Sequence, residues 1–163
     1  QIIFLMITLN LPTFEYKLKE DNGRYLIFDI LRKRYIALTP EEWVRQHFVN
    51  YLITYKGYPG GRIGNEISLD LNGRKRRCDT VIYRQNGTPF VIIEYKAPHI
   101  PITQAVFDQI VRYNVALKVE YLIVSNGKMH YCCHVNYKDQ SYLFLEDIPD
   151  YDSILSHTNE KTE

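Results

Sequence analysis

Two acidic residues and a lysine lie on either side of one short turn, in an order that suits phosphodiester chemistry. Asp79 precedes the dipeptide Asn86-Gly87, and Glu94 and Lys96 follow it. Asn-Gly between two apolar, β-branched runs is typical of a two-residue, type I′ hairpin turn. Facing residues of such a hairpin have numbers that sum to 173, as 86 and 87 do. Asp79 is therefore predicted to lie opposite Glu94, with Lys96 on the same face.

Facing carboxylates on one surface repel each other unless a cation lies between them, because their Cβ atoms are roughly 4.5 to 5.5 Å apart. Asp79 and Glu94 are therefore candidate ligands for Mg²⁺ or Mn²⁺, which prefer oxygen donors and polarise phosphate. Lys96 would orient the attacking water or stabilise charge on the phosphate. The chemistry predicted from these three residues is hydrolysis of a phosphodiester bond.

An ordinary solvent-facing hairpin would show the same alternation of charges. The sequence before Glu94 favours the site, because Val91, Ile92 and Ile93 form a continuous apolar run. Such a run is typical of a strand buried on both faces, and a carboxylate at the end of a buried strand needs a partner or a metal.

Two amphipathic helices are predicted to flank this hairpin. The first begins at Thr39-Pro40-Glu41-Glu42 and continues to about residue 55, with Thr39 as N-cap and Pro40 at the first helical position. Glu42 is placed either to close a capping box or to reach the site, and the sequence does not decide between Glu41 and Glu42. The second helix is predicted over residues 104–117.

Gln109 and Tyr113 share one face of this second helix because they are four residues apart. Either they contact a nucleic-acid phosphate, or Tyr113 belongs to the core and Gln109 is merely polar. Just before Asp79, residues 74–77 are all cationic and include Arg76 and Arg77. They could attract a phosphate backbone, although a basic turn is also a common solvated surface.

The composition is that of one ordinary domain, with 163 residues, 45% hydrophobic content and a formal net charge of +1. The net charge alone does not indicate a nucleic-acid binder. Three cysteines fit a protein of the reducing cytoplasm better than a disulfide scaffold. The apolar residues 1–9 are too short for a membrane span and lack the features of a signal peptide.

The ordered motifs resemble the PD-(D/E)xK nuclease superfamily, specifically the N-terminal nuclease domain of type I restriction enzyme R subunits. The resemblance covers residues 39–132 and is carried by Leu38-Thr39-Pro40-Glu41-Glu42-Trp43-Val44-Arg45-Gln46, Lys75-Arg76-Arg77-Cys78-Asp79, Glu94-Tyr95-Lys96-Ala97-Pro98, Gln109-x-x-x-Tyr113 and Ser125-Asn126-Gly127. It implies metal ligation by Asp79 and Glu94 and a catalytic Lys96. It also implies help from Glu42 on the first helix, and Gln109 and Tyr113 near DNA.

The expected fold is α/β, with a restriction-endonuclease-like core in which helices flank a mixed sheet. A single nuclease-like domain over 1–163 is expected, with an N-terminal β-hairpin layer (1–38), a core (39–149) and a C-terminal tail (150–163). The tail is expected to hold a short helix over 151–156 and to fray from Thr158. The expected function is a Mg²⁺- or Mn²⁺-dependent DNA endonuclease of the cytoplasm, either a homodimer or paired with other restriction-system subunits. The alternative is a non-catalytic nucleic-acid-binding or accessory subunit that keeps the nuclease fold.

Overall fold

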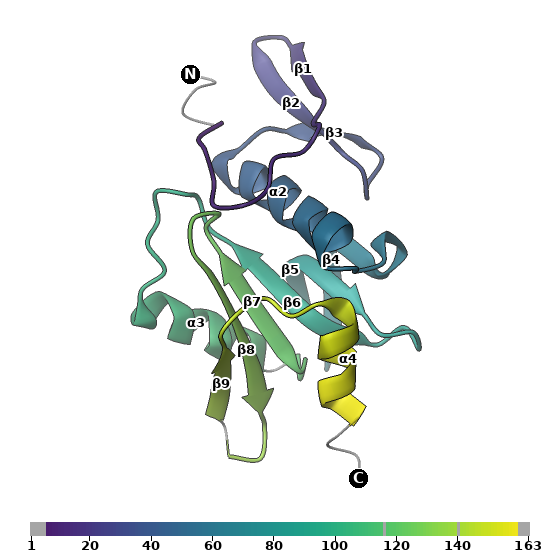
Figure 1. Ribbon diagram of the computed structural model, residues 1–163, viewed down its shortest axis with the longest axis vertical. Coiled ribbons are helices and arrows are strands. Elements are labelled where there is room, and N and C mark those ends of the chain that lie inside the picture. Colours follow the sequence, from purple (N-terminus) through teal and green to yellow (C-terminus); the bar gives the residue numbers. More distant parts are fainter. Residues whose placement is uncertain (1–5, 116, 140, 160–163) are drawn as a thin grey trace.

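The computed structural model describes residues 6–115, 117–139 and 141–159, which form two β-sheets and three α-helices (Figure 1). The strands are β1 (Leu18–Asp21), β2 (Arg24–Asp29), β3 (Arg34–Ala37), β4 (Ile63–Leu71), β5 (Arg74–Tyr83), β6 (Pro89–Tyr95), β7 (Tyr121–Ser125), β8 (His130–Asn136) and β9 (Ser141–Leu145). The helices are α2 (Pro40–Tyr55), α3 (Gln104–Val115) and α4 (Tyr151–Asn159), with a short 3₁₀ turn η1 (Gly60–Arg62) between α2 and β4.

The predicted N-terminal β layer is a three-stranded antiparallel sheet in the order β1-β2-β3. Its first turn uses Asn22 and Gly23, both of which have positive φ angles. In Figure 1 this sheet lies beyond α2, at the end of the molecule opposite the C-terminus. The tail helix α4 runs to Asn159, past the predicted end at residue 156. The fraying expected from Thr158 falls largely on residues 160–163, which lie outside the described residues.

The second sheet has six strands in the order β4-β5-β6-β7-β8-β9. Strands β6 and β7 run parallel and the other neighbours run antiparallel, so the sheet is mixed, as predicted. Strand β9 was not predicted. Its apolar residues Leu143 and Phe144 are both largely exposed although they alternate between faces, so its sequence lacks the pattern of a half-buried strand.

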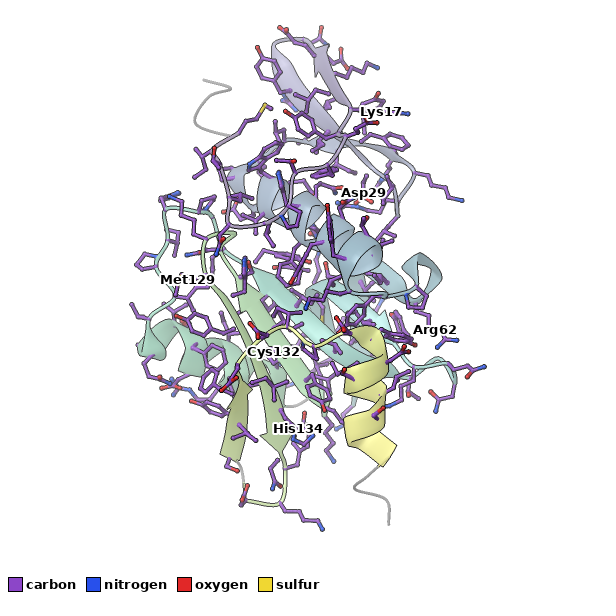
Figure 2. The ribbon with its side chains drawn as sticks, in the orientation of Figure 1. Lys17, Asp29, Arg62, Met129, Cys132 and His134 are labelled. Atoms are coloured by element: carbon purple, nitrogen blue, oxygen red, sulfur yellow. The ribbon has the colours of Figure 1, made fainter. Side chains whose placement is uncertain are left out.

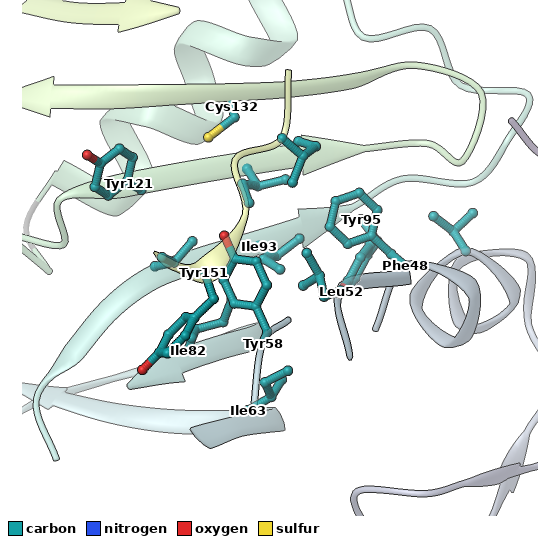
Figure 3. Close-up of a cluster of buried hydrophobic side chains, with 14 of the residues drawn as sticks. Phe48, Leu52, Tyr58, Ile63, Ile82, Ile93, Tyr95, Tyr121, Cys132 and Tyr151 are labelled. Atoms are coloured by element: carbon teal, nitrogen blue, oxygen red, sulfur yellow. The ribbon is translucent and has the colours of Figure 1, made fainter. Parts of the chain in front are cut away.

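Strand β6 is buried on both faces, as its apolar run predicted. Ile93 packs in a core with α2 and α4, which Figure 3 shows around Phe48, Tyr58 and Tyr151. Ile92 packs on the opposite face against α3. Because side chains alternate along a strand, Tyr95 follows Ile93 into the α2 core, and Glu94 points toward α3.

The turn between β5 and β6 differs from the predicted two-residue type I′ turn. The main-chain N–H of Arg84 donates to the carbonyl of Thr88, and Gly87 has a φ of 83° while Asn86 keeps a negative φ. A type I′ turn needs positive φ at both central residues, so the loop is longer than predicted. An irregularity between Ile82 and Tyr83 absorbs the one-residue difference.

The predicted register therefore holds beyond that irregularity. Ile82 pairs with Val91, Val81 with Ile92, and Thr80 with Ile93, and each pair sums to 173. No helix in the part of the chain that the structure describes has the length and apolar content needed to cross a membrane.

Candidate active site

Asp79, Glu94 and Lys96 come together where the β5–β6 ladder ends. The ladder stops at Thr80 and Ile93, and Asp79 and Glu94 are the next residues in the same register. The Asp79 Oδ2 accepts a hydrogen bond of 2.9 Å from the main-chain N–H of Tyr95. The Asp79 carboxylate and Lys96 both act on Glu94 electrostatically, so the three groups share one location. The structure thus brings these three predicted residues together.

The Glu94 carboxyl group is held in surroundings that disfavour its charge. Burial and the neighbouring Asp79 carboxylate raise the pKa of Glu94 to about 9, while Lys96 and the Asn114 side chain act in the opposite direction. Its buried Oε1 has no hydrogen-bond partner among the described residues. A bound cation near this oxygen would relieve both the repulsion from Asp79 and the unsatisfied acceptor.

Helix α3 covers this face of the sheet. Asn114 is buried beside Glu94 and donates through Nδ2 to the carbonyl of Ile110 at 2.9 Å. Gln109 lies exposed on the same helix. Tyr113 also lies on α3, but its side chain is outside the described part of the structure.

Glu42 lies on the first turn of α2 with both carboxylate oxygens bound by neighbouring side chains. Thr39 caps the helix as predicted, accepting the Glu42 main-chain N–H at 3.0 Å. The Glu42 carboxylate accepts from Arg32 Nη2 at 2.7 Å, from Arg45 Nε at 2.9 Å and from Gln46 Nε2 at 3.1 Å. The structure therefore connects Glu42 to the site through Arg45, and its described contacts do not include Asp79 or Glu94.

Arg45 links this cluster to the site. Its Nη1 donates to the main-chain carbonyl of Asp79 at 2.7 Å, and its Nη2 donates to Glu66 Oε1 at 2.6 Å. Glu66 also pairs with Arg77, although Arg77 remains 72% exposed. Arg76 is half-buried on the same strand. The two candidate DNA-contacting arginines thus lie on β5 within three residues of Asp79.

Two residues of this region were not identified from the sequence as members of the site. Asn114 interrupts the apolar face of α3 with a buried amide, and Arg45 is a buried cation three residues after Glu42. Both are polar residues on helix faces that contribute to the core. That pattern is a usable signal, because such groups need internal partners.

The donor set fits a hard divalent cation. Two carboxylates with one unpartnered oxygen match the oxygen ligands that Mg²⁺ takes, usually through one or two carboxylates and several waters. Within residues 6–115, 117–139 and 141–159 no cluster of three or more His, Cys, Asp and Glu is arranged to hold a metal. The candidate centre therefore consists of Asp79 and Glu94.

Residues 40–149 match the model of the family described as the type I restriction enzyme R protein N terminus. The chain belongs to this family. A search of curated proteins found no match to this R-protein N-terminal domain.

Among solved structures, the domain resembles a fragment structure assigned to an HsdR subunit of a type I restriction enzyme from Vibrio vulnificus YJ016. The match has a TM-score of 0.54 and 16% identity over 74% of this chain, and it spans 25% of that longer chain. At this identity the match supports a shared fold.

Proposed function

We propose that this R-protein N-terminal domain is a divalent-metal-dependent DNA endonuclease with a restriction-endonuclease-like core. The observation that carries the proposal is the contact between two carboxylates at the end of a buried strand, next to a lysine. An ion pair that only stabilises the fold places opposite charges together. Here two acidic side chains, Asp79 and Glu94, lie next to each other, and the buried Oε1 of Glu94 has no hydrogen-bond partner among the described residues. Paired acidic groups of this kind are typical of functional sites.

Asp79 and Glu94 would hold Mg²⁺ or Mn²⁺. A cation bound there supplies Lewis-acid polarisation of the scissile phosphate. The two carboxylates fix its location because both lie on rigid strands, and the Tyr95 main-chain N–H orients the Asp79 carboxylate. Holding the cation requires Glu94 to lose its proton, so metal affinity should increase with pH.

Lys96 would orient the attacking water or stabilise charge that develops on the phosphate. Its main-chain N–H donates to the carbonyl of Ser125 at 2.9 Å, which ties the residue to β7 just past the end of β6. Its ammonium group acts on Glu94 from the same face. A fixed cation directed at a phosphate contributes to catalysis because it needs no reorganisation during the reaction.

DNA would approach over α3 and the β4–β5 hairpin. Gln109 and Tyr113 are one turn apart on α3, and Arg76 and Arg77 lie on β5 close to Asp79. Amide, hydroxyl and guanidinium groups are the usual contacts to phosphate oxygens.

Glu42 would assist from α2 through its hydrogen bonds to Arg45. Partner subunits of a restriction system would supply the recognition of a specific DNA sequence.

The test is cleavage of supercoiled plasmid and of single-stranded DNA by the purified domain with Mg²⁺, Mn²⁺ or EDTA. We expect metal-dependent nicking that Lys96→Ala reduces about 100-fold or more, as expected for loss of a group that stabilises the transition state. Lys138→Ala is the matched control, because Lys138 is an exposed lysine near the β8–β9 turn. It should cut like the wild type.

Absence of cleavage by the wild type, or equal cleavage by wild type and Lys96→Ala, would contradict the nuclease proposal. Metal-independent DNA binding without cleavage would instead favour a non-catalytic accessory module. One site cuts one strand, so nicked circles are the expected product. Linear plasmid formed only at high protein concentration would indicate that two copies act together.

A further inference from the structure

Arg45 is a buried cation that contacts the main chain of Asp79 in the candidate active site. Its side chain is 8% exposed, and four hydrogen bonds from its guanidinium group reach Glu42, Glu66 and Asp79. Burial disfavours its charge, but Glu42 and Glu66 outweigh this and raise the pKa of Arg45 above its ordinary value. It therefore remains a cation that is fully engaged with internal partners.

The bond from Arg45 to Asp79 occurs where the β4–β5 ladder is interrupted. Asn65 pairs with Thr80 and Ile67 pairs with Cys78, but Glu66 and Asp79, which lie between these pairs, do not pair with each other. Glu66 has a φ of 55°, in the left-handed region that non-glycine residues rarely adopt. The main chain of Asp79 thus lacks its regular neighbour on β4, and its carbonyl accepts from Arg45 at 2.7 Å instead.

The same arginine closes a ring of side-chain and main-chain hydrogen bonds around Asp79. From Arg45 the ring passes through Glu42 and Arg32 to Asp29, which lies beside α2 in Figure 2. It returns through Asn65, Thr80 and Tyr95, whose main-chain N–H binds the Asp79 carboxylate, by bonds of 2.8 to 3.0 Å. Asp79 is therefore held at both its carbonyl and its carboxylate by one connected network.

We propose that Arg45 is a positioning residue that fixes Asp79 against Glu94, with Glu42 and Glu66 orienting its guanidinium group. This proposal rests on the proposed function, in which Asp79 and Glu94 bind the metal. Arg45 would not touch metal or DNA. It would act by holding the main chain of Asp79 where the β-ladder does not hold it.

The role requires the shape of arginine and not only its charge. A guanidinium group offers five N–H donors in a planar fork, so it can bind two carboxylates and a carbonyl at once. The ammonium group of lysine is a single point with three donors and cannot span the same acceptors. Arg45→Lys therefore keeps the charge and removes the geometry.

The test measures Mn²⁺ binding by the intact domain with calorimetry. Thermal unfolding in EDTA shows whether each variant is folded. We expect Arg45→Lys to bind Mn²⁺ about 10- to 100-fold more weakly than the wild type, the usual effect of losing a group that orients a metal ligand. Arg84→Lys is the matched control. Arg84 follows the last residue of β5, pairs with Glu120 and lies over the Phe90 ring. Its contacts among the described residues include neither Asp79 nor Glu94, so its replacement should leave Mn²⁺ affinity unchanged.

A second variant keeps the proposal testable if Arg45→Lys does not fold. Glu66→Gln removes the charge of one carboxylate that orients Arg45, at a half-buried position outside the α2 helix. It should weaken Mn²⁺ binding in the same direction. In cleavage assays both variants should need more metal for half-maximal rate and approach the wild-type rate at saturating metal.

The outcomes separate the two proposals. Wild-type affinity for Mn²⁺ in Arg45→Lys, or in Glu66→Gln where Arg45→Lys does not fold, would overturn the role of Arg45 and leave the nuclease proposal standing. Failure of the wild type itself to bind Mn²⁺ would overturn the metal site and, with it, the role of Arg45. Weaker binding in the variants beside unchanged binding in Arg84→Lys supports the proposal.

Discussion

Glu94 is the residue whose protonation bears most directly on the proposed metal site. Burial and the Asp79 carboxylate raise its pKa to about 9, from an ordinary value of 4.5. At neutral pH without metal, the carboxyl group is therefore largely protonated in the folded state and ionised in the unfolded state. The folded state binds more protons between these two values, so its stability falls as pH rises through that range.

We expect Glu94 to contribute a fall in the free energy of unfolding of the metal-free domain from about pH 5 to pH 9, of at most about 1.4 kcal/mol per pH unit. Glu94→Gln should remove this contribution because its side chain stays neutral. Urea denaturation in EDTA at several pH values measures the effect. Glu146→Gln, at an exposed position, is the control and should retain the wild-type slope.

Added Mg²⁺ should stabilise the wild type at pH 8 and leave Glu94→Gln nearly unchanged, because binding to the folded state raises its stability. Identical pH profiles for wild type and Glu94→Gln would show that the carboxyl group titrates normally.

At the scale of single elements, helix α2 carries Glu42 and Arg45, which are hydrogen-bonded to each other and, through Arg45, to the main chain of Asp79. Thr39 accepts the Glu42 main-chain N–H and sets where the helix begins. The Glu42 side chain, which a capping box would direct back to the N-cap, instead binds Arg32 and Arg45. Thr39 and Pro40 thus fix the start of the helix. The Glu42 side chain does not cap it and instead forms ion pairs with the two arginines.

Thr39→Ala should lower the free energy of unfolding by about 1 kcal/mol, because it leaves the Glu42 N–H without its acceptor at the N-terminus of α2. Thr39→Ser keeps the hydroxyl group and should cost much less. Chemical denaturation of both variants measures the difference. Equal losses in the two would assign the effect to the Thr39 methyl group and not to the cap.

At the scale of the whole molecule, the N-terminal sheet is joined to the central sheet through Asp29. Asp29 is fully buried and accepts from the main-chain N–H groups of Leu31 and Arg32, from Arg32 Nε and from Asn65 Nδ2. Burial acts to raise its pKa, but these donors lower it on balance below 3.8. The stabilisation is therefore present above about pH 4 and is lost as pH falls through the folded-state pKa.

Asp29→Ala should destabilise the domain by about 3 kcal/mol, because it leaves buried donors and the Arg32 cation without their acceptor. The loss should shrink at low pH, where the wild type also loses the interaction. Denaturation at pH 7 and at a series of lower pH values tests both points. Glu20→Ala removes an exposed carboxylate from β1 of the same layer and should change stability by less than about 0.5 kcal/mol.

The sequence by itself determined the helices around residues 40–55 and 104–115, the buried β6 strand and the register that brings Asp79 to Glu94. The helices and the buried strand follow from local physics. Apolar periodicity specifies the elements, and pleat alternation places Glu94 and Lys96 on one face. The register was correct although the turn was not, because the irregularity at Ile82 offset the longer loop.

Only the tertiary structure decided which partners the charged residues take. The sequence left Glu42 either a capping role or a site role. Its contacts in the structure depend on Arg32, which comes from the loop between β2 and β3, as well as on Arg45 one turn further along α2. The left-handed Glu66, the buried Asn114 beside Glu94 and the bond from Arg45 to Asp79 likewise depend on contacts between residues far apart in the chain. Hydrogen bonds between distant groups leave no periodic trace in the sequence, so they become visible only when the elements are packed.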